Sequence, residues 1–418
     1  MELLSPAGNI EKLQYAYEYG ADAAYIGLKK FSLRVKADNF YEDEYKKIIE
    51  LKKIYPGKRL HCALNITFHN SDIEKLKKEL DYFKQYPIDA FIVQDIGIVR
   101  LLQKEFPNVA LHLSTQANCI NYEAVKMYRD MGFSRVVLGR ETSLKEISEI
   151  KQHVPEMELE AFIHGAMCIS YSGRCLLSAY MNGRSANAGF CSHSCRWDYD
   201  LGLLAQSGEL VLREHQRPDE FFPIFEGDNF TAILSSKDLC MIDHLDDLKK
   251  AGVDSLKIEG RMKTAFYIAA VVKGYRYLFD CWQSQGFLTK EQLDHGQKII
   301  ALAENRECFT GFYYPSAAEN GQLYNINSTT ASQIFAANVL DYDDSRSMAV
   351  IEVRNHIEKG DMLKLLNPLG EASEFEAEMY DMEGKEVAIA NRPLQLLKLK
   401  VPAEAGEYSF VYLAGGRK

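Results

Sequence analysis

The chain has 418 residues, 47% of them hydrophobic and 26% charged, a composition typical of soluble globular proteins with room for about two or three domains. Lys plus Arg total 49 and Asp plus Glu total 59, and the net charge of −10 argues against a protein that mainly coats nucleic acid or anionic membranes. No apolar run approaches the roughly 20 residues that span a bilayer, and the start lacks a signal peptide, so we expect a cytoplasmic protein with no membrane role.

Short apolar runs alternate with amphipathic segments over the first 260 residues. The apolar runs predict eight strands, at Glu2–Leu4, Ala23–Leu28, Leu60–Ile66, Ala90–Asp95, Ala110–Thr115, Arg135–Arg140, Leu159–His164 and Ser255–Ile258. Helical spacing with capping residues predicts helices between them, at Asn9–Gly20, Asp72–Gln85, Asn121–Met131 and Ser143–His153. Repeated strand–helix units predict a parallel sheet, and the lack of G-x-G-x-x-G after the first strand favours an α/β (β/α)8 TIM-like barrel over an open doubly wound sheet.

The strand–helix rhythm fails from about Cys168 to Phe230, which predicts a long insertion before the last barrel strand. Helical patterns return at Asp243–Ala251, Ala265–Trp282 and residues 290–305. From about Gln333, short strands and turn glycines predict a small C-terminal β-barrel. We therefore expect a catalytic barrel at 1–330, with a cysteine-rich segment at 168–240, and an accessory domain at 331–418. The accessory domain has 10 basic and 15 acidic residues, so its net charge of −5 is half of the total.

Barrel enzymes carry their chemistry where the strands end on the C-terminal side. Nearly every predicted strand here ends in glycine or in a residue that can hydrogen-bond or titrate. Solvated loops make strand ends polar in many proteins, so each residue alone is weak evidence. Together they predict one polar rim, formed by Ser5-Pro6-Ala7-Gly8, Gly27, Asn65, Gln94-Asp95, Ser114-Thr115-Gln116, Arg140-Glu141, His164-Gly165 and Glu259-Gly260-Arg261.

The nine cysteines are unevenly distributed. Four lie in the insertion, with six, fifteen and three residues between them, and a fifth follows in Ser-Lys-Asp-Leu-Cys: Cys168, Cys175, Cys191, Cys195 and Cys240. This clustering favours soft-metal ligands over free thiols. The spacing alone leaves zinc and iron–sulfur open, and it does not select four ligands from the five. We interpret the other cysteines as bystanders: Cys62, Cys119, Cys281 and Cys308.

Basic residues accompany the cysteines. From Cys168 to Arg196 the chain has three arginines and no acidic residue. The arginines are Arg174, Arg184 and Arg196. A second basic group surrounds Glu259 and consists of Lys257, Arg261 and Lys263. Two such groups at one rim would bind a carboxylate or a phosphate, although loop arginines, Arg184 in particular, are also common as simple solvated residues.

The segments Glu160-Ala-Phe-Ile-His-Gly-Ala-Met-Cys168 and Gly173-Arg-Cys-Leu-Leu-Ser178 resemble the signature of the collagenase-like peptidase family U32. The resemblance extends to Ser5-Pro-Ala-Gly8, Cys191-Ser-His-Ser-Cys-Arg-Trp-Asp198, Ser236-Lys-Asp-Leu-Cys240 and Lys257-Ile-Glu-Gly-Arg261. It implies RNA or quinone hydroxylation, because members of that family include a tRNA wobble 5-hydroxyuridine hydroxylase, an rRNA cytidine hydroxylase and ubiquinone-pathway proteins. It also implies a [4Fe–4S] cluster and an oxygen donor such as prephenate.

By this resemblance, the cluster ligands would be Cys168, Cys175, Cys191 and Cys240, with Cys195 as the fifth candidate. Arg174, Arg196 and Arg261, beside Glu259, would hold the carboxylates of a small co-substrate or the phosphates of tRNA. His164 would transfer protons, which histidine does near neutral pH, unless it is simply a strand-end histidine bonded to the backbone. The acidic C-terminal domain would dock a protein partner. The alternatives are a collagenase-like peptidase, despite the lack of H-E-x-x-H and G-x-S-x-G motifs, and a non-enzymatic, metal-stapled RNA-binding or assembly module.

Overall fold

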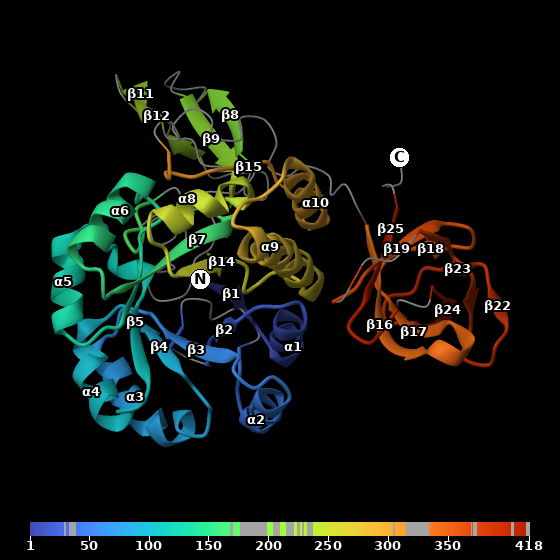
Figure 1. Cartoon of the computed structure of the whole chain (residues 1–418), viewed down its shortest axis with the longest axis horizontal. Helices are drawn as coiled ribbons and strands as arrows, with labels where there is room; N and C mark the ends of the chain where they lie inside the picture. Colours follow the sequence, from blue (N-terminus) through green and yellow to red (C-terminus); the bar gives the residue numbers. More distant parts are fainter. Residues whose placement is uncertain are drawn as a thin grey trace.

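A computed structural model describes residues 1–28, 31–32, 39–167, 170–175, 199–203, 210–214, 221–223, 226–227, 230–231, 237–303, 306–314, 334–368, 370, 374–402 and 405–414. Eight parallel strands form a closed barrel, in which each strand pairs with the next along the chain and the last pairs with the first (Figure 1). This confirms the predicted α/β barrel. The strands are β1 (Glu2–Pro6), β2 (Ala23–Ile26), β3 (Arg59–Leu64), β4 (Ala90–Val93), β5 (Ala110–Leu113), β6 (Arg135–Val137), β7 (Glu158–Ala166) and β14 (Ser255–Ile258).

Helices cover the outside of the barrel and begin largely at the predicted caps. Asn9, Asn121 and Ser143 each accept a backbone N–H from the first turn of the following helix. The sequence patterns missed α2, which buries only Ile48 and Leu51 and so has a narrow apolar stripe, and α4, which has seven residues. The helices are α1 (Ile10–Glu18), α2 (Glu44–Ile54), α3 (Asn70–Phe83), α4 (Val99–Glu105), α5 (Tyr122–Asp130), α6 (Leu144–His153), α8 (Leu245–Lys250), α9 (Ala265–Gln285) and α10 (Lys290–Ala301), with short 3-10 turns at η1 (Ile96–Ile98), η2 (Thr115–Ala117) and η5 (Ile242–His244).

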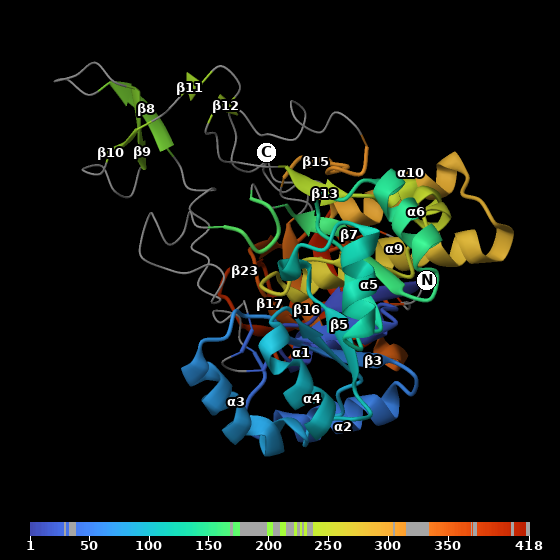
Figure 2. The same ribbon diagram turned by 90° about the vertical axis from the view of Figure 1, so that its left-hand side faces the viewer.

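The predicted insertion between β7 and β14 contains several short strands, and the helix predicted at Asp243–Ala251 is α8. Strand β13 (Asp238–Cys240) pairs antiparallel with the end of β7, and β15 (Cys308–Phe309) pairs with β13 on its other side. The remaining strands lie away from the barrel wall (Figure 2) and form two small antiparallel sheets: β8 (Tyr199–Leu203), β9 (Leu210–Glu214) and β10 (Phe221–Pro223), and β11 (Glu226–Gly227) with β12 (Phe230–Thr231).

The C-terminal region forms a curled antiparallel sheet with its own apolar core, which includes Ile351, Leu363 and Leu399. Its strand order is β20-β19-β25-β16-β17-β24-β21-β22, with β18 paired to β23. The elements are β16 (Phe335–Asp343), η6 (Asp344–Arg346), β17 (Met348–Val353), β18 (Ile357–Glu358), β19 (Met362–Leu366), β20 (Phe375–Glu376), β21 (Met379–Tyr380), β22 (Glu386–Val387), β23 (Ile389–Ala390), β24 (Leu396–Lys400) and β25 (Phe410–Leu413).

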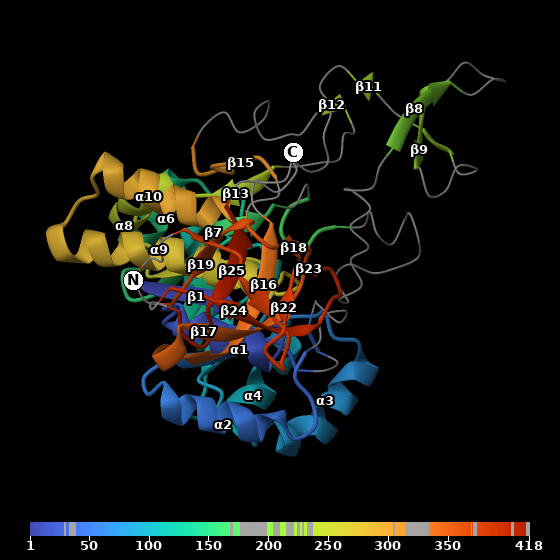
Figure 3. The ribbon, with the colours of Figure 1, turned by 90° about the vertical axis from the view of Figure 1, so that its right-hand side faces the viewer.

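This sheet packs against α1 and α9 of the barrel, on the side shown in Figure 3. Phe410 is fully buried there and stacks on Tyr15 of α1, with ring centroids 4.6 Å apart. The hydroxyl of Tyr19 lies 2.7 Å from the carbonyl of Leu366 and 2.8 Å from that of Tyr408. The two regions thus share aromatic packing and hydrogen bonds. Within the part of the chain that the structure describes, no helix has the length and apolar character needed to cross a membrane.

Candidate metal and substrate site at the barrel mouth

The segment that carries Cys175 is fixed across the ends of β5 and β6. The buried Ser172 donates its hydroxyl to Glu141 over 3.0 Å, and the hydroxyl of Thr115 lies 3.3 Å from that of Ser172. Gly173 adopts a φ of +73°, and a Cβ there would lie 2.0 Å from the backbone oxygen of Gln116. Only glycine fits so close an approach. These contacts hold the half-buried Cys175, a candidate ligand, at the barrel mouth.

Cys240 reaches the same end of the barrel through β13. In the antiparallel register Cys240 lies opposite His164, near the end of β7. The hydroxyl of Tyr275, which donates to the Ile163 carbonyl over 2.8 Å, lies 3.8 Å from the Cys240 sulfur. A hydrogen bond with Cys308 lowers the pKa of the Cys240 thiol most, burial opposes this, and His164 adds to the lowering, so the net pKa is well below its usual value. A thiolate is the form that binds metals.

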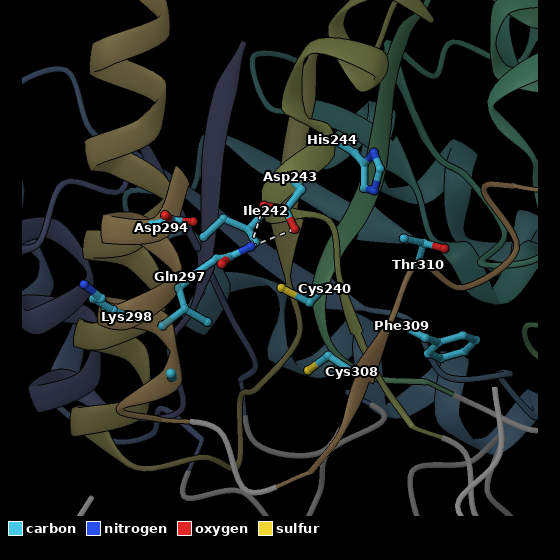
Figure 4. A pocket seen from close by; sticks show the side chains of 12 residues that line it. Cys240, Ile242, Asp243, His244, Asp294, Gln297, Lys298, Cys308, Phe309 and Thr310 are labelled. Atoms are coloured by element: carbon cyan, nitrogen blue, oxygen red, sulfur yellow. Dashed lines mark hydrogen bonds between the residues drawn. The ribbon is translucent and has the colours of Figure 1, made fainter. Parts of the chain in front are cut away.

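Cys308, which the sequence interpretation treated as a bystander, lies on the strand next to that of Cys240. Its thiol is a hydrogen-bonding neighbour of Cys240, because β15 lies beside β13. Both cysteines line one cavity of about 620 Å³ between η5, α10 and β15, and their sulfur atoms point to the same side (Figure 4). Asp243 and Gln297 also line it and are joined by hydrogen bonds of 2.7 and 2.8 Å. Cys62 and Cys119 are buried, which raises the pKa of each to about 12, in keeping with inert core residues.

His164 is buried at 3% exposure between Tyr267, Tyr275 and Cys240. Its Nδ1 atom has no hydrogen-bond partner within the described ranges. The ring can exchange hydrogen bonds with Cys240, a predicted ligand.

Arg261 is buried, at 3% exposure, at the end of β14. A Cβ on Gly27 would lie 2.5 Å from Nη1 of Arg261, 2.7 Å from Oδ1 of Asn39 and 2.8 Å from Oγ of Ser32. The guanidinium, the amide and the hydroxyl thus meet over a bare glycine at the end of β2. The guanidinium of Arg261 and the hydroxyl of Ser32 offer donors of the kind that a carboxylate or phosphate requires, whereas Oδ1 of Asn39 is an acceptor.

Glu259 and Arg140 connect the ends of β14 and β6. Nη2 of Arg140 lies 3.5 Å from Oε2 of Glu259, and the guanidinium lies 3.8 Å from the centroid of the Phe162 ring. Tyr267 donates its hydroxyl to the backbone oxygen of Glu259 over 3.0 Å. The structure therefore brings Glu259, Arg261, His164, Cys175 and Cys240 to one end of the barrel.

Arg174 is exposed and precedes Cys175 in the chain. The other predicted site residues, Cys168, Cys191, Cys195 and Arg196, lie outside the described residues. For an iron–sulfur cluster, the donor chemistry of the two described candidates fits, since both Cys175 and Cys240 offer thiols at the same rim.

A charged network fills the barrel below the rim, and it includes Lys257, which the sequence interpretation had placed in a basic group at the rim. Glu160 is fully buried and pairs with Lys257 at 2.5 Å and with Arg135 at 3.0 Å. Burial raises the pKa of Glu160, but Lys257 and Arg135 outweigh it and lower the value to about 2. In the sequence, this network is indicated only by single polar residues within apolar strands. Their positions do not reveal which residues face one another in the barrel.

His61 and His112 lie within that network, with ring centroids 4.8 Å apart. Burial lowers the pKa of His61 to about 4 and that of His112 well below its usual value, so both rings are neutral. Together with Glu160 they have the spacing of metal ligands. The two cations already paired to Glu160 would repel a divalent ion, so we interpret the group as structural.

A closed parallel barrel with polar groups gathered at the C-terminal ends of its strands is the architecture of barrel enzymes. Residues 8–323 match the model of peptidase family U32, and residues 331–411 match the model of the peptidase family U32 C-terminal domain. The chain belongs to peptidase family U32.

Three relatives show how broad the names within this family are. The tRNA hydroxylation protein P1 of Bacillus subtilis is 38% identical over 404 residues, which cover 96% of this chain and 92% of the relative. An uncharacterized protease of Methanocaldococcus jannaschii is 33% identical over 401 residues, which cover 94% of this chain and 93% of the relative. The 23S rRNA 5-hydroxycytidine C2501 synthase of Escherichia coli is 36% identical over 280 residues, 67% of this chain and 39% of the relative.

Proposed function

We propose that this protein hydroxylates RNA in the cytoplasm, with uridine at the tRNA wobble position as its substrate and an iron–sulfur cluster as its cofactor. The observation that carries the proposal is the likeness to the Bacillus tRNA hydroxylation protein over nearly the full length of both chains. The likeness to an rRNA hydroxycytidine synthase supports the same class of chemistry on a pyrimidine of RNA.

Four cysteines would hold a [4Fe–4S] cluster at the mouth: Cys168, Cys175, Cys191 and Cys240, with Cys195 as the substitute candidate. When bound, such a cluster supplies electron transfer and a Lewis-acidic iron. The chain itself holds Cys175 through Ser172 and Glu141, and Cys240 through the pairing of β13 with β7. Both anchors involve described strand ends, which keeps the thiols on rigid elements.

Arg261 would bind a carboxylate of the oxygen donor, for which prephenate is our candidate, or a phosphate of the RNA. Its burial beside Ser32 and Asn39 favours a small anion, because a buried guanidinium interacts more strongly than an exposed one. Arg174, which is exposed, would contact a larger partner such as the RNA backbone. We propose the same role for Arg196 from the sequence alone. His164 would carry a proton at Nδ1, and Glu259 would orient Arg140.

Deletion of the gene followed by nucleoside mass spectrometry of total tRNA tests the substrate. We expect 5-hydroxyuridine and nucleosides built from it to decline strongly. Unchanged levels would exclude this substrate. If rRNA hydroxycytidine declines instead, the chemistry stands and the substrate is different.

Proteolysis is the second candidate function, and the name of the Methanocaldococcus relative favours it. It predicts that purified protein cleaves gelatin and continues to do so after the metal is removed. An assembly module without enzymatic activity predicts that Cys168→Ala lowers stability while no modified nucleoside depends on the protein.

A further inference from the structure

Two strands that are distant in the sequence bring Cys240 and Cys308 together. The parallel pairing of β13 with β15 sets Asp238 opposite Cys308 and Leu239 opposite Phe309. Alternate residues of a strand face the same side, so Cys240 shares a side with Asp238 and therefore with Cys308. The cavity wall that the two cysteines share in Figure 4 agrees with this.

Small reagents can reach this thiol pair. Both cysteines are half-buried rather than sealed in the core. The cavity that they line, about 620 Å³, is within the size range of pockets that admit small organic molecules, roughly 300–1,000 Å³. Cys62 and Cys119, by contrast, are buried in the apolar core.

We propose that Cys240 and Cys308 form a reversible disulfide with one another when the protein holds no metal. The oxidant is a low-molecular-weight disulfide such as oxidised glutathione. One cysteine thiolate attacks a sulfur of that molecule, which breaks its S–S bond, releases one small thiol and leaves a mixed disulfide. The second cysteine, after losing its proton, attacks the protein sulfur of the mixed disulfide and expels the second small thiol. The protein loses two electrons and two protons, and the small disulfide gains them.

The consequence rests on the proposed role of Cys240 as a cluster ligand. A cysteine in a disulfide has no thiolate to offer, so the oxidised protein would bind iron poorly until it is reduced. The disulfide with Cys308 would thus protect Cys240. Cluster loading would then depend on the ratio of oxidised to reduced small thiols in the cell. Irreversible oxidation of Cys240 would be avoided in the same way.

Peptide mass spectrometry tests the bond directly. Metal-free full-length protein is treated with oxidised glutathione, its free thiols are alkylated, and it is digested with trypsin without reduction. We expect residues 238–249 linked to residues 307–346, each of which contains a single cysteine. Cys308→Ser should abolish this linkage, whereas Cys281→Ser, which alters a half-buried cysteine on α9, should retain it. Absence of the linked pair in wild type, with both thiols alkylated, would overturn the proposal.

Iron uptake separates this inference from the proposed cofactor. Pre-oxidised wild type should take up several-fold less iron on anaerobic reconstitution than reduced wild type, and Cys308→Ser should be insensitive to the pre-treatment. If the linked peptides form and reduced protein binds no iron, the cofactor proposal fails while the disulfide stands. If reduced protein binds iron and the linked peptides never form, only the disulfide inference fails.

Discussion

Charge inside the barrel is balanced residue by residue. Glu160 faces Lys257 and Arg135, and Arg135 also contacts Glu2 at 2.5 Å. Removing one partner from such a group leaves a buried charge uncompensated and costs several kcal/mol. His61 and His112 complete the network as neutral rings, and this makes the barrel sensitive to acid.

We predict that the free energy of unfolding falls as the pH drops from 7 to 5. Burial holds the pKa of His61 at about 4 and that of His112 lower than usual, whereas unfolded histidine titrates near 6.5. Below that pH the unfolded chain binds protons that the folded chain does not, so stability decreases by up to about 1.4 kcal/mol per pH unit for each ring. Urea denaturation of His61→Gln should show a pH slope smaller by about that amount. His153→Gln, which alters an exposed ring on α6, should retain the wild-type slope.

At the scale of elements, the segment at 170–175 depends on a close approach to the end of β5. Ser172 and Gly173 provide it, one by a hydrogen bond to Glu141 and the other by lacking a Cβ against Gln116. Neither the strand pattern nor the cysteine spacing reveals such a contact, because it joins residues that are remote in the chain.

Gly173→Ala should release this segment from the barrel. The new Cβ would collide with the Gln116 backbone oxygen, and the φ of +73° would be strained. We expect faster hydrogen–deuterium exchange at 170–175 and a lower iron content after reconstitution. Gly57→Ala is the matched control, since Gly57 has a φ of +90° with no atom within 4 Å of an added Cβ. If both variants exchange alike at 170–175, the proposed docking is wrong.

The barrel and its capped helices were predictable because each strand–helix unit repeats a local pattern. Asn9, Asn121 and Ser143 are caps in the structure as in the sequence. The placement of His164, Glu259 and Arg261 at one rim was predictable for the same reason, since the parallel strands of a barrel end at the same side. The proximity of Cys308 to Cys240 did not follow, because it depends on a two-residue strand, β15, that carries almost no periodic signal.

At the scale of the whole molecule, the C-terminal sheet is joined to the barrel through an aromatic cluster. Phe410 contacts Tyr15, Phe266 and Phe335, and it belongs to the same apolar core as the barrel helices. The acidic character of this domain, net −5, suits a protein partner better than RNA phosphate.

Phe410→Ala should weaken this connection. Loss of a fully buried phenylalanine costs about 3–5 kcal/mol, and we expect the C-terminal sheet to unfold separately from the barrel in a denaturant titration. Phe287→Ala, which removes a side chain that is 59% exposed, should change stability by about 0.5 kcal/mol or less. A single unchanged transition in Phe410→Ala would show that the cluster does not couple the two regions.

The most direct test of the central proposal joins the site to the reaction. Strains that lack the gene are supplied with the wild-type, Cys240→Ser or Cys281→Ser protein at equal levels, and their tRNA is analysed for 5-hydroxyuridine by mass spectrometry. Wild type and Cys281→Ser should restore the nucleoside, and Cys240→Ser should not. Full restoration by Cys240→Ser would contradict an iron–sulfur hydroxylase built on this barrel mouth.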